Sequence, residues 1–189
     1  MTYSLVPASQ WFSLEGLLKQ CREEAMEALV RLILTSDGTV TRLLEALSLS
    51  PVEVELIVHQ KTLLPKEVAD FLELETGQPA IARDVWLHIG DQRLVYASSC
   101  LPLQGMNKTL YSQIVEQKKP LGSLIGEYHY PALRDKMGFC QVQSPKIAEA
   151  LGTMTSERFW ARRCRLRVEG ILQAFIIEVF SPRLFTGFK

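Results

Sequence analysis

Apolar residues recur at helical or strand spacing along most of the chain. In SLEGLLKQCREEAMEALVRLIL they return every three or four positions, which predicts a helix over 13–34. VEVELIVHQ alternates apolar and polar residues and predicts a half-buried strand over 52–60. The same patterns predict further helices at 39–47, 64–74, 107–117 and 145–151, and further strands at 80–89, 93–103, 162–168 and 171–180. The rest of 128–156 predicts irregular structure.

The predicted strands come in hairpins. Gly90-Asp91-Gln92 joins one pair of strands and Glu169-Gly170 joins the other, without strand–helix–strand units. Hairpins favour an antiparallel sheet with helices packed on one face. No internal repeat, low-complexity tract or linker divides the 189 residues. The sequence therefore predicts a single α+β domain over 1–189.

Composition and charge narrow the class of protein. Hydrophobic residues make up 47% of the chain and charged residues 22%, as in ordinary globular proteins. The 21 Lys and Arg residues balance the 21 Asp and Glu residues, so no overall field favours nucleic acid or an anionic membrane. No apolar run approaches the roughly 20 residues of a membrane helix. MTYSLVPASQWFSLEG lacks the features of a signal peptide, so we expect a cytoplasmic protein.

Cysteine and histidine positions give no sign of a metal site. The four cysteines, Cys21, Cys100, Cys140 and Cys164, are widely spaced and include no C-x-x-C pair. We expect reduced and mostly buried thiols rather than disulfides. The three histidines are equally far apart, so the sequence predicts no metal.

Two charged residues fall on apolar strand faces. Because side chains alternate along a strand, Arg83 is the only charge on one face of 80–89, and Glu178 is the only charge on one face of 172–180. An unpaired buried charge costs several kcal/mol, so each residue needs a partner. One interpretation is a structural salt bridge between the two. The other is a pocket in which Arg83 binds a ligand carboxylate and Glu178 a ligand hydroxyl.

A run of arginines precedes Glu178. Arg163, Arg165 and Arg167 share one face of their strand, a pattern typical of a half-exposed strand with its arginines in water. A nucleic-acid-binding stripe is the alternative, but the chain is neutral and no aromatic residues lie between the arginines. Three cations beside a pocket would also attract a dianionic substrate. We expect the partner that matters for Glu178 to be Arg83, not an arginine of this run.

The C-terminal segment FWARRCRLRVEGILQAFIIEVFSP, residues 159–182, resembles the signature of the chorismate pyruvate-lyase family. IARDVWL is similar to that family's arginine-bearing strand, and KKPLGSLI to its Pro-Leu-Gly turn. SDGTVTRLLE resembles the family's short segment before the second helix. The resemblance spans roughly residues 30–182 and is closest to the cyanobacterial and plastid branch.

This resemblance implies a fold, a reaction and a set of site residues. It implies an antiparallel sheet with helical flaps over a buried site, and conversion of chorismate to 4-hydroxybenzoate and pyruvate without cofactor or metal. Arg83 would bind the ring carboxylate, assisted by the backbone N–H of Leu121, and Glu178 would bind the ring hydroxyl. Arg83 and Glu178 would thus be both catalytic and substrate-binding, in what we expect to be a monomer that serves quinone, here plastoquinone, synthesis.

Three departures from the family pattern concern the pocket. A methionine that the family places near the ligand is replaced here by Thr39 or Val40, and we expect Thr39 among the substrate-binding residues. The bacterial enzymes have Gly-Arg-Thr where this chain has Ala97-Ser98-Ser99, so we expect a positive group to be missing near the pocket. The segment 128–156 is longer than in the bacterial enzymes, so we expect a different flap.

A second class of function shares this fold. The strand, LPKEVADFLEL and the following hairpin resemble the ligand-sensing domains of bacterial transcription regulators, which would bind an aromatic carboxylate without converting it. Those domains normally follow a winged-helix DNA-binding domain, and no basic recognition helix precedes residue 50 here. The acidic, amphipathic CREEAMEAL suits packing on a sheet better than contact with DNA. The sequence favours the lyase, with the sensing domain as the alternative.

Overall fold

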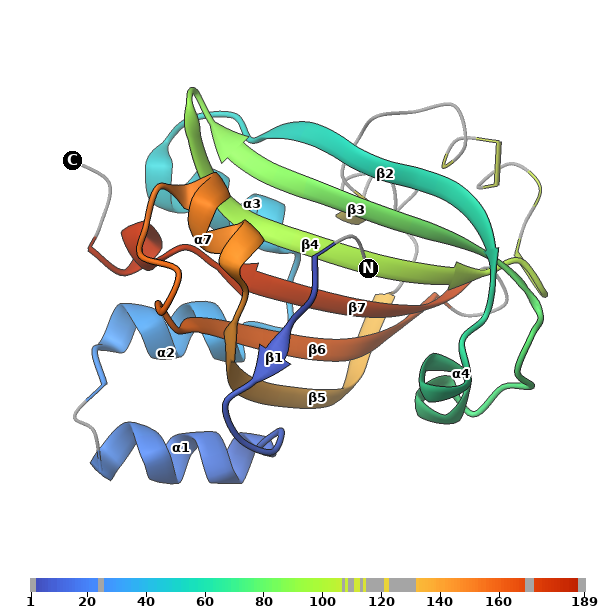
Figure 1. The fold of residues 1–189 in the computed structure, drawn as a ribbon, viewed down its shortest axis with the longest axis horizontal. Helices are drawn as coiled ribbons and strands as arrows, with labels where there is room; N and C mark the ends of the chain where they lie inside the picture. Colours follow the sequence, from blue (N-terminus) through green and yellow to red (C-terminus); the bar gives the residue numbers. More distant parts are fainter. Residues whose placement is uncertain are drawn as a thin grey trace.

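The computed structural model describes residues 3–23, 26–106, 108, 111–112, 114, 121–122, 132–168 and 172–186. Among these residues, antiparallel strands form one curled sheet in the order β1-β5-β6-β7-β4-β3-β2 (Figure 1). The strands are β1 (Val6–Pro7), β2 (Glu53–Leu63), β3 (Pro79–Ile89), β4 (Gln92–Pro102), β5 (Ala132–Gln143), β6 (Phe159–Val168) and β7 (Leu172–Phe180). The antiparallel α+β fold expected from the hairpins is confirmed.

The helices are α1 (Leu14–Glu23), α2 (Ala28–Thr35), α3 (Val40–Ser48), α4 (Lys66–Leu72) and α7 (Pro145–Leu151), with a short 3-10 helix at Pro182–Phe185. The helices predicted at 39–47, 64–74 and 145–151 therefore form. The helix predicted at 107–117 falls largely outside the described residues, and Leu121 and Gly122 further along the chain are helical. None of the helices in the described ranges is long and apolar enough to cross a membrane.

The single helix predicted over 13–34 is wrong, because the chain forms α1 and α2 instead. The buried side chains explain the break. Leu17 and Cys21 are buried in α1, whereas Val30 and Ile33 are buried in α2. At about 100° per residue, one continuous helix would carry these two pairs on nearly opposite faces. Two helices with different directions allow both pairs to face the sheet.

Strand β5 was not predicted, since its region was expected to be irregular. The pairing of β5 with β6 shifts between Asp135 and Gly138, which is a bulge or similar irregularity. Lys136 lies in this region with a φ of 49°, and its Nζ donates to the Phe71 carbonyl at 2.9 Å. The bulge interrupts the alternation of apolar and polar residues, so the sequence pattern of a strand is lost there.

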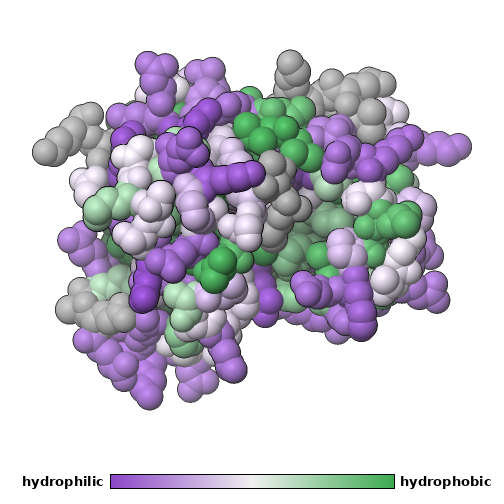
Figure 2. Space-filling model, viewed as in Figure 1, coloured by the Kyte–Doolittle hydropathy of each residue, from purple (hydrophilic) through white to green (hydrophobic). Residues whose placement is uncertain are grey.

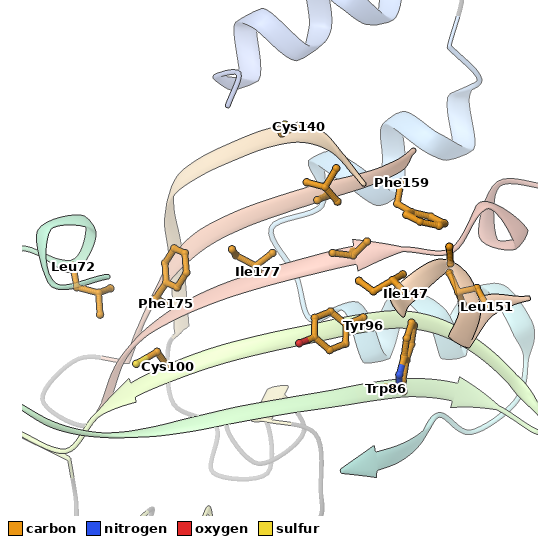
Figure 3. Packing of buried hydrophobic residues seen from close by; sticks show 14 of the residues in the cluster. Leu72, Trp86, Tyr96, Cys100, Cys140, Ile147, Leu151, Phe159, Phe175 and Ile177 are labelled. Atoms are coloured by element: carbon orange, nitrogen blue, oxygen red, sulfur yellow. The ribbon is translucent and has the colours of Figure 1, made fainter. Parts of the chain in front are cut away.

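The sheet has two covered faces. The outer face carries Trp86 and Tyr96, whose ring centroids are 5.5 Å apart, and α7 packs Ile147 and Leu151 over it (Figure 3). The pocket face is the opposite face and carries Arg83. On that side α1, α2 and α3 share a hydrophobic cluster with strand residues. Helices therefore lie on both faces rather than on one, because α4 and α7 contribute to the outer cluster.

Part of the outer face remains open beside α4. A groove there is lined by Phe71, Phe175 and Ile177 together with Arg163. Figure 2 shows apolar side chains exposed on this face of the molecule.

The four cysteines are buried and unbridged, as predicted. Burial raises the pKa of Cys164 to about 12 and that of Cys100 to about 11. These thiols therefore remain protonated near neutral pH, as expected of inert core cysteines.

Candidate active site

The residues predicted for the site line one pocket on the pocket face. Arg83, Glu178, Leu121 and Thr39 all contribute to its wall. Val40 does so as well, so both candidates for the family's methionine position face the same space. The curl of the sheet and the start of α3 enclose this pocket, and side chains from β3, β4, β5, β6 and β7 reach it.

The alternation of side chains places Arg83 and Glu178 as the sequence predicted. Arg83 is 4% exposed and Glu178 is 6% exposed. Strand β4 lies between their strands, with Ser99 opposite Arg83 and Ala97 opposite Glu178. At about 4.8 Å per strand and about 3.4 Å per residue, their Cα atoms are about 12 Å apart. This separation allows the two charged groups to contact different parts of a small ligand.

The ion-pair partner of Glu178 is Arg162, which corrects the expectation that no arginine of the run would matter. Arg162 lies directly opposite Glu178 in the β6–β7 register, and its Nε donates to Glu178 Oε2. The Arg162 side chain is fully buried. A direct pair of Arg83 with Glu178 is therefore not the arrangement seen among the described residues. Arg162 precedes Arg163 in the strand, so its side chain points to the opposite face, which is the inward one.

Arg162 also holds the end of α2 against the sheet. Its Nη1 donates to the carbonyl oxygens of Ile33 at 3.1 Å, Leu34 at 3.2 Å and Ser36 at 2.6 Å. These acceptors lie in the last turn of α2 and just after it, where backbone carbonyls lack partners within the helix. A cation at this end is also favoured by the helix dipole. One buried guanidinium thus fixes both the Glu178 carboxylate and the segment that leads to Thr39.

Arg83 is the second buried cation of the site. Desolvation lowers the pKa of Arg83 to about 10, so the guanidinium stays charged at neutral pH. His59 lies opposite it in the β2–β3 register. Burial, and next the charge of Arg83, lower the pKa of His59, which favours the neutral imidazole. A ligand carboxylate beside Arg83 would offset the cost of burying its charge.

The start of α3 forms another wall of the pocket. Thr39 is the residue before the helix, yet its side chain does not cap the backbone. Thr39 Oγ1 is buried and has no hydrogen-bond partner within the described part of the chain. Gly122 lies against Thr39, because a Cβ built on this glycine would be 2.9 Å from Thr39 Cγ2. Leu121 and Gly122 therefore fit closely over the start of α3, next to the pocket.

Arg134 is a pocket residue that the sequence reasoning missed. It comes from β5, pairs with Leu166 in the β5–β6 register, and lines the pocket. Its Nη1 donates to the carbonyl oxygen of Asp37 at 3.1 Å. The expectation of a missing positive group is therefore wrong, because a different strand supplies one. No signal was available, since β5 itself was not predicted.

The remaining arginines of the run do not flank the pocket. Arg163, Arg165 and Arg167 lie on the outer face, opposite the pocket. Arg165 donates to Asp135 at 2.7 Å and to Glu73 at 2.8 Å, and Arg167 forms an ion pair with Asp135 at 2.6 Å. Arg163 stacks between two aromatic rings, 4.7 and 5.2 Å from their centroids. These residues are paired or stacked rather than simply solvated, and they lie on the face opposite the pocket.

Comparisons with known proteins agree with this architecture. A model of the family described as "Chorismate pyruvate-lyase Rv2949c-like" matches residues 34–187. A "Probable chorismate pyruvate-lyase" from Pseudomonas aeruginosa is 26% identical over 151 residues, which are 80% of this chain and 82% of that protein.

Solved structures share the fold at low sequence identity. PhnF from Mycobacterium smegmatis matches with a TM-score of 0.62 and 13% identity over 93% of this chain and 89% of that one. A GntR-family transcriptional regulator from Bacillus cereus matches with a TM-score of 0.54 and 9% identity over 70% of this chain and 92% of that one. These two show the fold alone. The family match over most of the sequence shows more: the chain belongs to the Rv2949c-like chorismate pyruvate-lyase family.

Proposed function

We propose that this protein eliminates pyruvate from chorismate and releases 4-hydroxybenzoate. The observation that carries the proposal is the pocket, because the buried Arg83 and the buried Glu178 both contribute to its wall. The chain also belongs to a chorismate pyruvate-lyase family. Glu178 pairs with Arg162, which lies opposite it on the neighbouring strand. A site for a small ring with a carboxylate and a hydroxyl group accounts for both.

Substrate binding follows from the charges. Arg83 binds the ring carboxylate through charge-assisted hydrogen bonds, and the Leu121 backbone N–H adds a further donor. Glu178 accepts a hydrogen bond from the ring hydroxyl. Since Oε2 is engaged by Arg162, the other oxygen, Oε1, is the acceptor that we assign to the substrate. The ring is then held between two fixed groups, as the elimination requires.

The reaction needs little chemistry from the protein. The bond between the ring carbon and the ether oxygen breaks, and the neighbouring carbon that bears the hydroxyl loses its proton. The ring becomes aromatic, while the enolpyruvyl methylene gains a proton and the ether oxygen becomes the keto oxygen of pyruvate. We assign Glu178 the task of orienting the hydroxyl as an ion-paired acceptor, with the proton passing within the substrate. Arg162 supports this task by fixing the carboxylate.

The pocket must widen when the ring enters. Its free volume is about 50 Å³, and each water molecule needs about 10–15 Å³ by a similar measure. It therefore has room for a few water molecules but not for a benzene ring. We assign this widening to the close contact between Gly122 and Thr39. Closure over the ligand would exclude water and strengthen the interactions with both guanidinium groups.

The test is turnover by the wild type and by Glu178→Gln. Purified wild-type protein incubated with chorismate should form 4-hydroxybenzoate and pyruvate in equal amounts. Glu178→Gln keeps the shape of the side chain but loses the charge, and should lower kcat about 100-fold, within the range expected for losing one oriented catalytic interaction. Glu53→Gln, an exposed residue on β2, is the matched control and should leave kcat unchanged.

Two outcomes would contradict the proposal. Chorismate that binds but remains intact would indicate a sensing domain rather than a lyase. Full turnover by Glu178→Gln would remove the carboxylate from the mechanism. If turnover occurs, we further assign the 4-hydroxybenzoate to quinone synthesis, with plastoquinone the product if the cyanobacterial and plastid resemblance holds.

A further inference from the structure

Two buried polar atoms of the pocket have no hydrogen-bond partner among the residues that the structure describes. One is Nε of Arg134 and the other is Oγ1 of Thr39. Both residues line the same pocket. Buried polar atoms in native proteins nearly always have partners, and leaving one unsatisfied costs free energy. The shared location of two unpaired hydrogen-bonding groups therefore indicates a ligand group that accepts hydrogen bonds.

Arg134 is held in position by the same segment that carries Thr39. Its Nη1 donates to the Asp37 carbonyl at 3.1 Å, two residues before Thr39. The thiol of Cys164 lies near the guanidinium of Arg134, and that positive charge acts to lower the pKa of the thiol. A thiol is only a weak hydrogen-bond acceptor, however. Strand β5 and the start of α3 thus present one guanidinium and one hydroxyl to the pocket.

The described wall of the pocket carries cations on two different strands. Its described wall contains the cations Arg83 and Arg134 and the anion Glu178. Glu178 pairs with Arg162, which lies directly opposite it on β6. The guanidinium groups of Arg83 and Arg134 both line the described part of the pocket. Arg83 and Arg134 also stand on strands separated by β4, β7 and β6, so they approach the pocket from different sides.

We propose that Arg134 and Thr39 bind the second carboxylate of the substrate, the one on its enolpyruvyl group. This assignment rests on the proposed lyase function and deepens it. Arg83 then binds the ring carboxylate, and the two guanidinium groups match a dianion. Arg134 also stabilises the carboxylate of the departing pyruvate as the carbon–oxygen bond breaks.

The assignment has a consequence for specificity. Chorismate has both carboxylates, whereas 4-hydroxybenzoate keeps only that of the ring. Arg134 therefore discriminates the dicarboxylate substrate from the monocarboxylate product, while Arg83 serves both. Losing Arg134 should weaken the two ligands unequally, which a purely structural role would not do.

The experiment compares chorismate with 4-hydroxybenzoate on three variants. Arg134→Gln should raise the KM for chorismate about 10-fold to 100-fold, as expected for losing a charge-assisted hydrogen bond. Its dissociation constant for 4-hydroxybenzoate, measured by calorimetry, should change less than about twofold. Thr39→Val should raise the KM for chorismate several-fold. Its dissociation constant for 4-hydroxybenzoate should also change less than about twofold. Arg42→Gln removes an exposed charge on α3 and should change neither value.

Three results decide the assignment. Equal weakening of both ligands by Arg134→Gln would overturn it, because the residue would then only support the pocket. An unchanged KM would overturn it as well. If Arg134→Gln does not fold, Arg134→Lys keeps the charge and should still weaken chorismate selectively. If the wild type binds chorismate without converting it, the dissociation constants of both ligands still test the assignment, while the proposed function alone fails.

Discussion

Replacing Arg162 by methionine tests the most connected residue of the site. Methionine keeps much of the apolar stem but removes the guanidinium. Glu178 would then be a carboxylate 6% exposed and without its ion-pair partner. The carbonyl oxygens of Ile33, Leu34 and Ser36 would lose their donor at the same time. The substitution should therefore both destabilise the fold and loosen the end of α2.

The structure sets the expected magnitude. Breaking a buried ion pair by removing one partner costs about 3–5 kcal/mol, because a buried charge is left uncompensated. The three carbonyl contacts share one nitrogen, so they place the cost toward the upper part of that range rather than adding in full. With a urea m-value of about 2 kcal/mol per molar, the denaturation midpoint should fall by about 1.5–2.5 M.

Urea denaturation followed by circular dichroism measures this directly. Arg167→Met is the matched control on the same strand, because Arg167 is largely exposed and its ion pair with Asp135 should contribute less than about 1 kcal/mol. A midpoint shift for Arg162→Met no larger than that of the control would refute the view that Arg162 fixes Glu178 and α2.

Three further predictions concern the pocket and its core. Arg83→Ala should weaken 4-hydroxybenzoate binding at least tenfold, as measured by calorimetry, and should lower Tm only slightly. If affinity for 4-hydroxybenzoate persists while Tm falls sharply, the role of Arg83 is structural. Gly122→Ala should raise the KM for chorismate, since the new Cβ would lie 2.9 Å from the stiff side chain of Thr39. Gly38→Ala is the control, because its new Cβ would meet nothing closer than 3.6 Å. Equal effects of the two substitutions on KM would contradict the close fit of Gly122 against Thr39. Desolvation, and next the charge of Glu178, raise the folded pKa of Cys164 to about 12. The unfolded thiol ionises near pH 8.5, so the folded state loses stability as pH rises from there toward 12, by about 2 kcal/mol at pH 10. Cys164→Ala should show a smaller loss of urea stability between pH 7 and 10, and an identical loss would contradict this.

The sequence predicted much of the sheet and of the pocket because both depend on local alternation. The hairpins around residues 90 and 170 were readable from glycine turns between apolar strands. The same alternation placed Arg83 and Glu178 on one inward face. These predictions needed no knowledge of distant contacts.

The missed features depend on contacts between distant segments. The break between α1 and α2 reflects which faces meet the sheet, and nothing in 13–34 alone states that. Strand β5 was hidden by its bulge, and Arg134 was missed with it. Arg162 is different, because the alternation assigned it inward and only its place in an arginine run concealed it. Its partner Glu178 is sixteen residues away in the chain but directly opposite in the register.

A single-turnover experiment tests the central claim most directly. Wild-type protein in molar excess over chorismate, without added metal, is quenched over time, and chorismate, 4-hydroxybenzoate and pyruvate are quantified. The lyase account predicts that all chorismate disappears and that the two products appear together in equal amounts. Chorismate recovered intact after binding to the protein would contradict it.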